Sequence, residues 1–175
     1  AITHFARALG AARSGDADTA RQAIDTLATL RDRTAETSAY WAKQVEIQRL
    51  SALAWLAYQE GRKEEALSTM QQAAALEAET EKHPVTPGEI LPAHELLADM
   101  LLDLGRPKDA LAAYEAALER STNRFNSLYG AGHAAQQAGD KDTAADYYRR
   151  LVENAAPQAQ GPQLQQARAF LAGQS

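Results

Sequence analysis

The sequence predicts an all-α solenoid of about four helix hairpins, followed by a C-terminal capping helix. One observation is a repeat: Gly105 and Gly139 lie 34 residues apart, and each is followed by alanine at +5 and tyrosine at +9. The other is composition. The chain of 175 residues is rich in alanine, contains only 10 glycines and 6 prolines, and lacks an alternating apolar stretch typical of a strand. Such a period is typical of helical units that complete their core by stacking on neighbours.

The spacing of glycine, alanine and a large residue has a physical reason. Glycine ends a helix in the left-handed conformation without a Cβ penalty, and alanine lets two helices approach closely. The residue four positions later lies on the same helical face and fills the space between units. Gly15 and Gly61 start two further copies, with isoleucine or methionine at +9. Pro107 suits the first turn of the next helix, and Asp140 suits a helix N-cap.

The elements follow from these signals in chain order. Helices are predicted over residues 2–13, 17–33, 37–60 and 63–82. The helix over 37–60 has two apolar stripes, one of which contains Trp41, Val45 and Trp55, so we expect neighbours to cover it on two sides. We expect a single repeat domain over 1–175, with repeats at about 1–34, 37–82, 90–123 and 124–156 and a cap at 162–173.

Three segments carry a resemblance to a known family: Tyr40–Gln48, Glu81–Gly88, and Asn123–Phe125 with Ser127–Ala131. The chain resembles the tetratricopeptide-repeat family, and in particular the C-terminal part of larger bacterial members of unassigned function. The resemblance implies a right-handed superhelix whose concave face binds peptides or partner proteins. Because a helical half precedes this region in such proteins and the chain starts at Ala1, we expect a processed product or a fragment.

The resemblance also implies a set of groove residues on the first helix of each unit. They are Gln48, Ser51, Trp55, Tyr58, Glu95, Asp99, Asp103, Asn126, Tyr129, His133 and Gln136. Aromatic residues interleaved with carboxylates would suit a peptide with basic or amphipathic character. The alternative is that a neighbouring helix covers Trp55 and Tyr58 and that the acids are simply solvated. His83, in a loop with two prolines, is a further candidate, and a rigid connector is its alternative.

Composition and motifs exclude several classes of function. The net charge of −5 and the pI near 5.4 do not favour nucleic-acid binding. Without cysteine there is no disulfide or thiolate metal site, and His94–Glu95 lacks the second histidine of a zinc-protease helix. No phosphate loop, dinucleotide fingerprint or nucleophile elbow occurs, so no cofactor and no catalytic residue is expected. No apolar run reaches the ~18 residues of a membrane span. The compartment, bacterial cytoplasm or periplasm, stays open.

We therefore expect a non-enzymatic scaffold that binds a protein or peptide whose identity the sequence does not give. The alternative is a structural module that self-associates, as a homodimer for example. A small-molecule or enzymatic role centred on His83 and the acidic residues has the least support.

Overall fold

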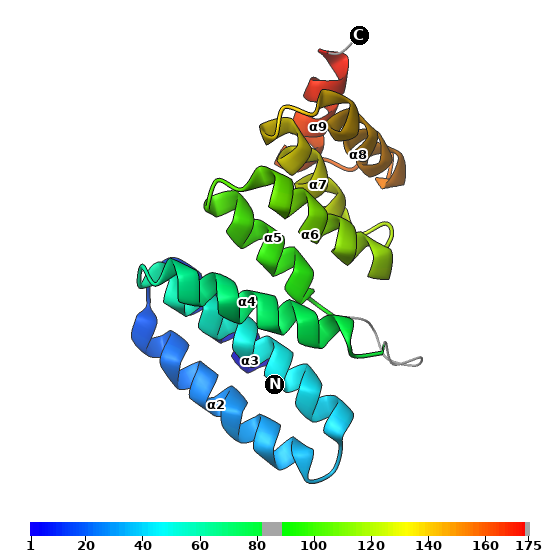
Figure 1. Ribbon diagram of the computed structural model, residues 1–175. Coiled ribbons are helices and arrows are strands. Elements are labelled where there is room, and N and C mark those ends of the chain that lie inside the picture. The colour runs from blue at the N-terminus through cyan, green and yellow to red at the C-terminus, as the bar shows by residue number, and fades with distance from the viewer. Residues whose placement is uncertain (82–88, 174–175) are drawn as a thin grey trace. The chain divides into compact units, whose positions relative to one another are not determined.

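The regular structure of the chain is helical throughout the part described here, residues 1–81 and 89–173 of a computed structural model (Figure 1). These residues form α1 (Ile2–Ser14), α2 (Ala17–Ala35), α3 (Ala39–Gln59), α4 (Lys63–Ala78), α5 (Ala93–Asp103), α6 (Pro107–Arg120), α7 (Phe125–Gln137), α8 (Lys141–Asn154) and α9 (Pro162–Ala172). Successive helices are joined by short turns in most of the chain. The predicted solenoid of helix hairpins with a final capping helix is confirmed.

The chain divides into two compact units, Ala1–Leu96 and Leu97–Ser175, with the boundary inside α5. In the first unit, α3 is central and packs against α1, α2 and α4. In the second unit, α7 packs against α6 and α8, and α9 packs mainly on α8. Each unit therefore buries its apolar residues between consecutive hairpins. The organisation as a single domain over 1–175 stays a prediction.

The turns inside the hairpins confirm the glycine spacing. Four glycines have positive φ in the described chain, between 71° and 85°, and they are the four that start the repeated pattern: Gly15, Gly61, Gly105 and Gly139. A residue with a Cβ is strained in this left-handed conformation, whereas glycine is not. Each glycine therefore ends one helix and reverses the chain into its partner.

The residues at +5 and +9 occupy the interior, as predicted. The alanines at +5 are fully buried: Ala20, Ala66, Ala110 and Ala144. The larger residues at +9 are also buried: Ile24, Met70, Tyr114 and Tyr148. The predicted caps form too, because the Asp140 carboxylate accepts a hydrogen bond from the backbone N–H of Thr143 at 3.1 Å and Pro107 lies in the first turn of α6. The bond from Thr143 lowers the pKa of Asp140.

Some boundaries differ from the sequence expectations. Helix α3 begins at Ala39, where the Ser38 hydroxyl accepts the N–H of Trp41 at 3.3 Å and caps the helix. Trp41, predicted to be covered, is 43% exposed because it lies in this first turn. Helix α4 ends at Ala78, and the Thr80 hydroxyl bonds back to the carbonyl of Leu76 at 2.7 Å. The helix therefore does not reach the predicted end at residue 82.

Candidate functional site

In the first unit, the predicted groove residues of α3 are partly buried. Ser51 and Trp55 are each about 1% exposed, and the Ser51 hydroxyl donates to the carbonyl of Ile47 at 2.8 Å. The Arg13 guanidinium of α1 lies 4.3 Å from the Trp55 ring centroid and covers that ring. Because α1 packs on α3, Ser51 and Trp55 do not face an open surface, which corrects that expectation. Gln48 and Tyr58 remain half-buried.

On α5 the three predicted acids have different environments. Glu95 is buried at 3% exposure, which corrects its placement on an open face. Asp99 is half-buried and accepts a hydrogen bond from the Tyr114 hydroxyl at 2.6 Å. Asp103 is exposed at the end of the helix. Only Asp103 therefore has the simple solvated position that the alternative interpretation gave to these acids.

Helix α7 brings its four predicted residues onto one face, which we call the α7 face: Asn126, Tyr129, His133 and Gln136. Asn126 and Gln136 are exposed, and Tyr129 and His133 are half-buried. The phenol and imidazole rings stack with centroids 5.9 Å apart and planes inclined by 5°. Two amide side chains thus flank a stacked pair of rings, which combines polar and apolar contact groups on one helical surface.

The α7 face is held by hydrogen bonds to neighbouring helices. The Tyr129 hydroxyl donates to Gln166 of α9 at 2.7 Å, and the Tyr148 hydroxyl of α8 donates to Gln136 at 3.0 Å. Burial raises the pKa of Tyr129 and lowers the pKa of His133. Both shifts favour the uncharged form of the side chain, so the face is electrically neutral at physiological pH.

Two glycines of α7 explain how two tyrosines pack against this helix. A Cβ at Gly130 would lie 2.2 Å from the Tyr114 ring, and a Cβ at Gly132 would lie 2.7 Å from the Tyr148 ring. The missing side chains therefore let each ring approach the α7 backbone. Two glycines inside one apolar helix are the sequence signal for this close packing.

A buried carboxylate that the sequence analysis missed fixes the start of α5. Glu77 of α4 is 1% exposed, and its side chain accepts the backbone N–H of Ala93 at 2.7 Å and that of His94 at 3.4 Å. The His94 Nδ1 atom lies 3.2 Å from the same carboxylate. A carboxylate at a helix N-terminus satisfies unpaired N–H groups and complements the helix dipole. Ala93 lies 16 residues after Glu77, whereas the sequence rules for helix caps concern residues only a few positions apart.

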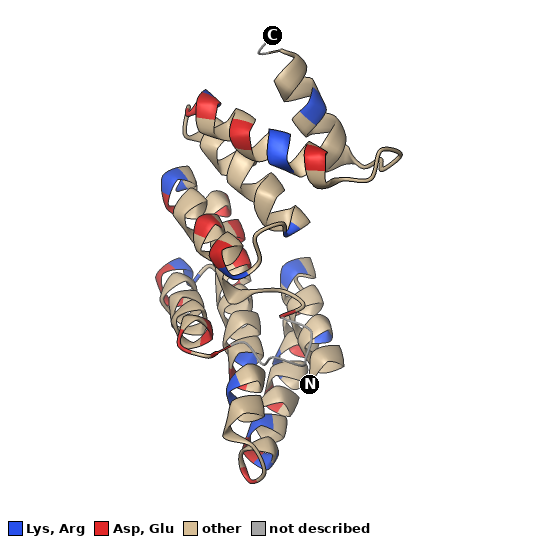
Figure 2. Ribbon diagram, turned by 90° about the vertical axis from the view of Figure 1, so that its right-hand side faces the viewer, with Lys and Arg blue, Asp and Glu red and all other residues tan. Residues whose placement is uncertain are grey.

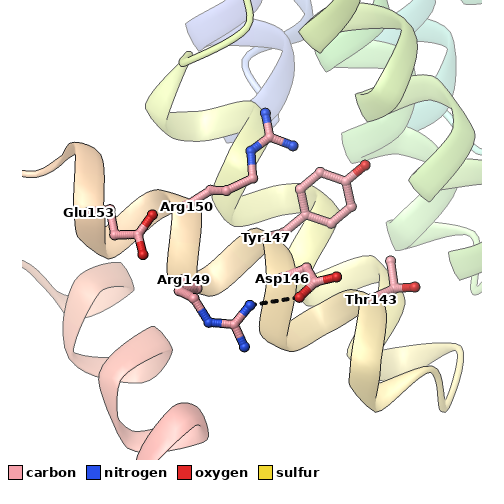
Figure 3. A pocket seen from close by; sticks show the side chains of 6 residues that line it. All are labelled: Thr143, Asp146, Tyr147, Arg149, Arg150 and Glu153. Carbon is pink, nitrogen blue, oxygen red and sulfur yellow. Dashed lines mark hydrogen bonds and ion pairs between the residues drawn. The ribbon is translucent and has the colours of Figure 1, made fainter.

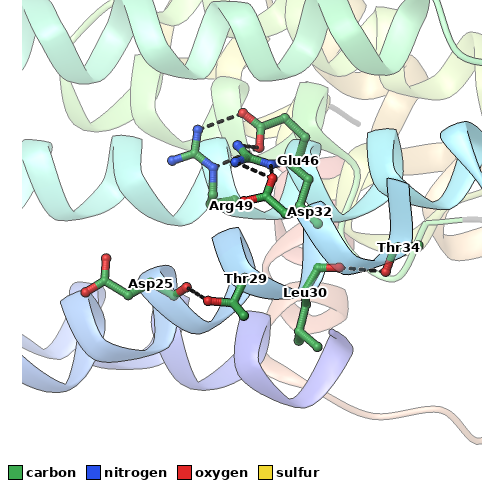
Figure 4. Close-up of polar contacts among 8 residues, drawn as sticks. Asp25, Thr29, Leu30, Asp32, Thr34, Glu46 and Arg49 are labelled. Atoms are coloured by element: carbon green, nitrogen blue, oxygen red, sulfur yellow. Dashed lines mark hydrogen bonds and ion pairs between the residues drawn. The ribbon is translucent and has the colours of Figure 1, made fainter. Parts of the chain in front are cut away.

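An ion cluster joins α2 to α3 (Figure 4). Arg31 contacts Asp32 and also donates to the Glu46 carboxylate at 2.9 Å, and Arg49 donates to both oxygens of Glu46 at 2.7 and 2.8 Å. Burial raises the pKa of Glu46, but the hydrogen bonds from Arg49 and Arg31 outweigh it, so the pKa is lowered overall. The geometry indicates a structural contact, since the Glu46 oxygens are occupied by the two guanidinium groups.

The outer face of α8 has a wide shallow depression (Figure 3). It encloses about 460 Å³ and is lined by Thr143, Asp146, Tyr147, Arg149, Arg150 and Glu153. Arg149 pairs with Asp146 at 2.7 Å, and Arg150 donates to the carbonyl of Thr122 at 3.1 Å. Burial and a hydrogen bond to Glu115 raise the pKa of Tyr147 to about 12. Arg149 and Asp146 are therefore paired with each other, whereas Arg150 is held by a backbone carbonyl.

The described part of the chain has no candidate metal centre. Over residues 1–81 and 89–173, no group of three or more His, Asp or Glu side chains is arranged to hold a metal ion. Charged residues of both signs occur on helices of both units (Figure 2). None of the helices described here has the length and apolar character needed to cross a bilayer. The loop candidate His83 lies outside the described residues.

Family models described as tetratricopeptide repeat match most of the chain. One model matches residues 91–124 and 125–157, and two others match residues 50–84 and 1–26. The chain belongs to the tetratricopeptide-repeat family. Each of the four glycine turns lies within one of these matched segments, so the family match and the observed hairpins agree.

Solved tetratricopeptide-like structures share the fold of this repeat protein. The crystal structure of PcrH from Pseudomonas aeruginosa is 21% identical, with a TM-score of 0.55 over 73% of this chain and 89% of that one. The crystal structure of MamA is 17% identical, with a TM-score of 0.53 over 87% of this chain and 90% of that one. No curated protein sequence matches this repeat protein significantly. The structural likeness establishes the fold.

Proposed function

We propose that this repeat protein is a non-enzymatic scaffold that binds a protein or peptide partner. The α7 face carries the proposal, because its exposed Asn126 and Gln136 amides flank the stacked rings of Tyr129 and His133. Amides can pair with the backbone of an extended peptide, and aromatic rings supply contact area at a low cost in side-chain entropy. Membership of a helical-repeat family supports this interpretation.

The proposal is tested by selecting peptides from a display library on the immobilised full chain. A selected peptide is then titrated against the wild type and against Asn126→Ala, which removes one exposed amide of the α7 face. We expect the Kd to rise about tenfold, the effect of losing roughly 1.4 kcal/mol of binding free energy. Arg149→Ala, on the exposed surface of α8, is the matched control and should leave the Kd unchanged.

The opposite pattern counts against the proposal. A selection that yields no saturable binder leaves the scaffold without a ligand of the proposed class. A binder that is insensitive to Asn126→Ala but lost in Arg149→Ala assigns the binding surface to α8 instead.

A second candidate function is self-association, and exposed apolar side chains of the first unit favour it. Ile2 is 55% exposed and Trp41 is 43% exposed, and Trp41 makes an edge-to-face contact with Tyr40 at a centroid distance of 4.9 Å. Burying such residues in a dimer would remove apolar area from water. Sedimentation equilibrium tests this function: a dimer that Trp41→Ser dissociates supports it, and a monomer at all concentrations rejects it.

A further inference from the structure

A small cavity lies in the first unit, beside the half-buried groove residue Gln48. Its polar lining comes from Gln44 and Gln48 of α3, Glu77 of α4 and Glu89 ahead of α5, and its apolar lining includes Phe5 and Ile47. The volume is about 30 Å³. Space of this size holds one group as large as a water molecule.

The cavity contains an acceptor without a donor. The Gln48 Oε1 atom is buried and has no hydrogen-bond partner. A buried polar atom in this state raises the free energy of the fold, so a donor from outside the chain would be favourable. Glu77 can accept a further hydrogen bond. A carboxylate has about four acceptor sites, and three nitrogen atoms of Ala93 and His94 face this one.

The charge of the surroundings selects the kind of donor. Among the described residues that line the cavity, two are glutamates and none is Lys, Arg or His. The described residues 77–81 and 89–95, which include Glu77 and Glu89, contain five glutamates and no lysine or arginine. A ligand carboxylate or phosphate would be repelled here, whereas a positively charged donor would be attracted.

We propose that this cavity receives the ammonium group of a lysine side chain from the bound peptide. An ammonium is about the size of water and carries three N–H donors, which suits Gln48 Oε1 and a carboxylate oxygen together. Its four-carbon stem can lie along Ile90 and Leu91, which are the more exposed apolar residues of the lining. A planar guanidinium with five donors needs more room than the cavity provides. This inference rests on the proposed function, since it names the partner as a lysine-containing peptide.

The first test uses n-butylammonium chloride, which reproduces the stem and the ammonium of lysine. The probe is titrated into the ¹⁵N-labelled full chain while amide chemical shifts are recorded by NMR. We expect saturable shifts of the Gln44 and Gln48 side-chain amides, and of the Ala93 and His94 backbone amides that bond to Glu77. n-Butanol and sodium chloride at equal concentrations control for the stem and for ionic strength, and neither should reproduce the pattern.

A matched pair of variants locates the binding. Gln48→Met keeps the side-chain length but removes the acceptor, and we expect the n-butylammonium affinity to fall about tenfold or more. Gln59→Met makes the same change at the exposed end of α3 and should leave the affinity unchanged. The inference is overturned if no saturable shift occurs, if n-butanol gives the same shifts, or if Gln48→Met has no effect.

A second measurement separates this inference from the proposed function. Each lysine of a selected peptide is replaced by norleucine, which keeps the stem and removes the ammonium. We expect one replacement to weaken binding about tenfold in the wild type and to have no effect in Gln48→Met. Peptides that bind equally well after every replacement overturn the lysine assignment and leave the scaffold function standing. Failure of every peptide to bind rejects the scaffold function, while the n-butylammonium titration still decides whether the cavity accepts an ammonium.

Discussion

Glu77 shows how a single side chain can determine where a distant helix begins. Its carboxylate is nearly inaccessible to water, yet it receives the N–H groups of Ala93 and His94 at the start of α5. Burial of a charge without such partners would be strongly unfavourable. The contact therefore stabilises the first turn of α5 and links α4 to α5, although 16 residues separate Glu77 from Ala93.

Replacing Glu77 by glutamine should destabilise this link. In glutamine, an amide nitrogen replaces one carboxylate oxygen and cannot accept a hydrogen bond. At least one buried N–H group therefore loses its partner. We expect the free energy of unfolding to fall by about 1–3 kcal/mol in urea titrations, and the Ala93 and His94 amides to exchange faster with solvent. Glu79→Gln, an exposed change two residues later, is the control and should alter stability by less than about 0.5 kcal/mol. Equal effects of the two substitutions would contradict the assigned role.

Glycine-to-alanine substitutions should have opposite signs at two helical positions. Gly130→Ala forces the Tyr114 ring away from its hydrogen bond with Asp99, so we expect a net loss of about 1–2 kcal/mol after the gain in helix propensity. Gly10→Ala in α1 meets no atom within 4 Å and should stabilise the chain by up to about 1 kcal/mol. Thermal or urea unfolding of both variants measures the signs. A stabilised Gly130→Ala variant would mean that Tyr114 does not pack there as described.

At the residue scale, the sequence predicts what local rules determine. The glycine turns and the buried +5 and +9 residues follow from helix geometry, and the structure confirms them. The contacts of Glu77 and Glu46 could not be predicted in the same way, because each carboxylate bonds to a residue of another helix. The burial of Trp55 has a similar cause, because Arg13, which covers its ring, lies far away in the sequence.

At the scale of elements, α7 combines packing and surface roles. Its glycines admit Tyr114 and Tyr148 on the buried side, while Asn126 and Gln136 remain exposed. The helical spacing of the α7 face was predictable, because residues three and four positions apart share a side of a helix. Its hydrogen bonds to α8 and α9 were not, since they depend on how these helices pack.

His133 should make the stability of the α7 region depend on pH. Burial lowers its pKa below the ordinary value of 6.5, so the unfolded chain binds more protons than the folded chain near that pH. Stability is therefore expected to fall as pH drops below about 6.5. The C2 proton of His133, followed by NMR, should titrate below 6.5, and the fall in melting temperature between pH 7 and 5.5 should be smaller in His133→Gln. A His133 titration at or above 6.5 would contradict this account.

Helix α9 should protect α8 through one aromatic contact. The Phe170 ring lies 5.2 Å from the Tyr148 ring in an edge-to-face arrangement, and Tyr148 is fully buried. We expect Phe170→Ala to lower the free energy of unfolding by about 1–2 kcal/mol, from lost apolar burial and ring contact. Arg168→Ala, an exposed change in the same helix, provides the comparison in urea titrations. Equal stability of Phe170→Ala and wild type would show that α9 does not cap the final repeat in this way.

At the scale of the whole molecule, repetition explains why the architecture was predictable while the ligand was not. Four copies of one turn pattern determine four hairpins, and the family match agrees with them. The binding residues differ from copy to copy, so no repeated signal identifies them. Ser51, Trp55 and Glu95 occupy positions that the family pattern places on a groove, yet they are buried in this chain.

The most direct test of the scaffold function is a map of amide chemical-shift changes when a selected peptide binds the full chain. We expect the changes to concentrate on the α7 face, at Asn126, Tyr129, His133 and Gln136. The outer face of α8, from Thr143 to Glu153, should be unaffected. A map centred on α8, with the α7 face unchanged, would contradict the account.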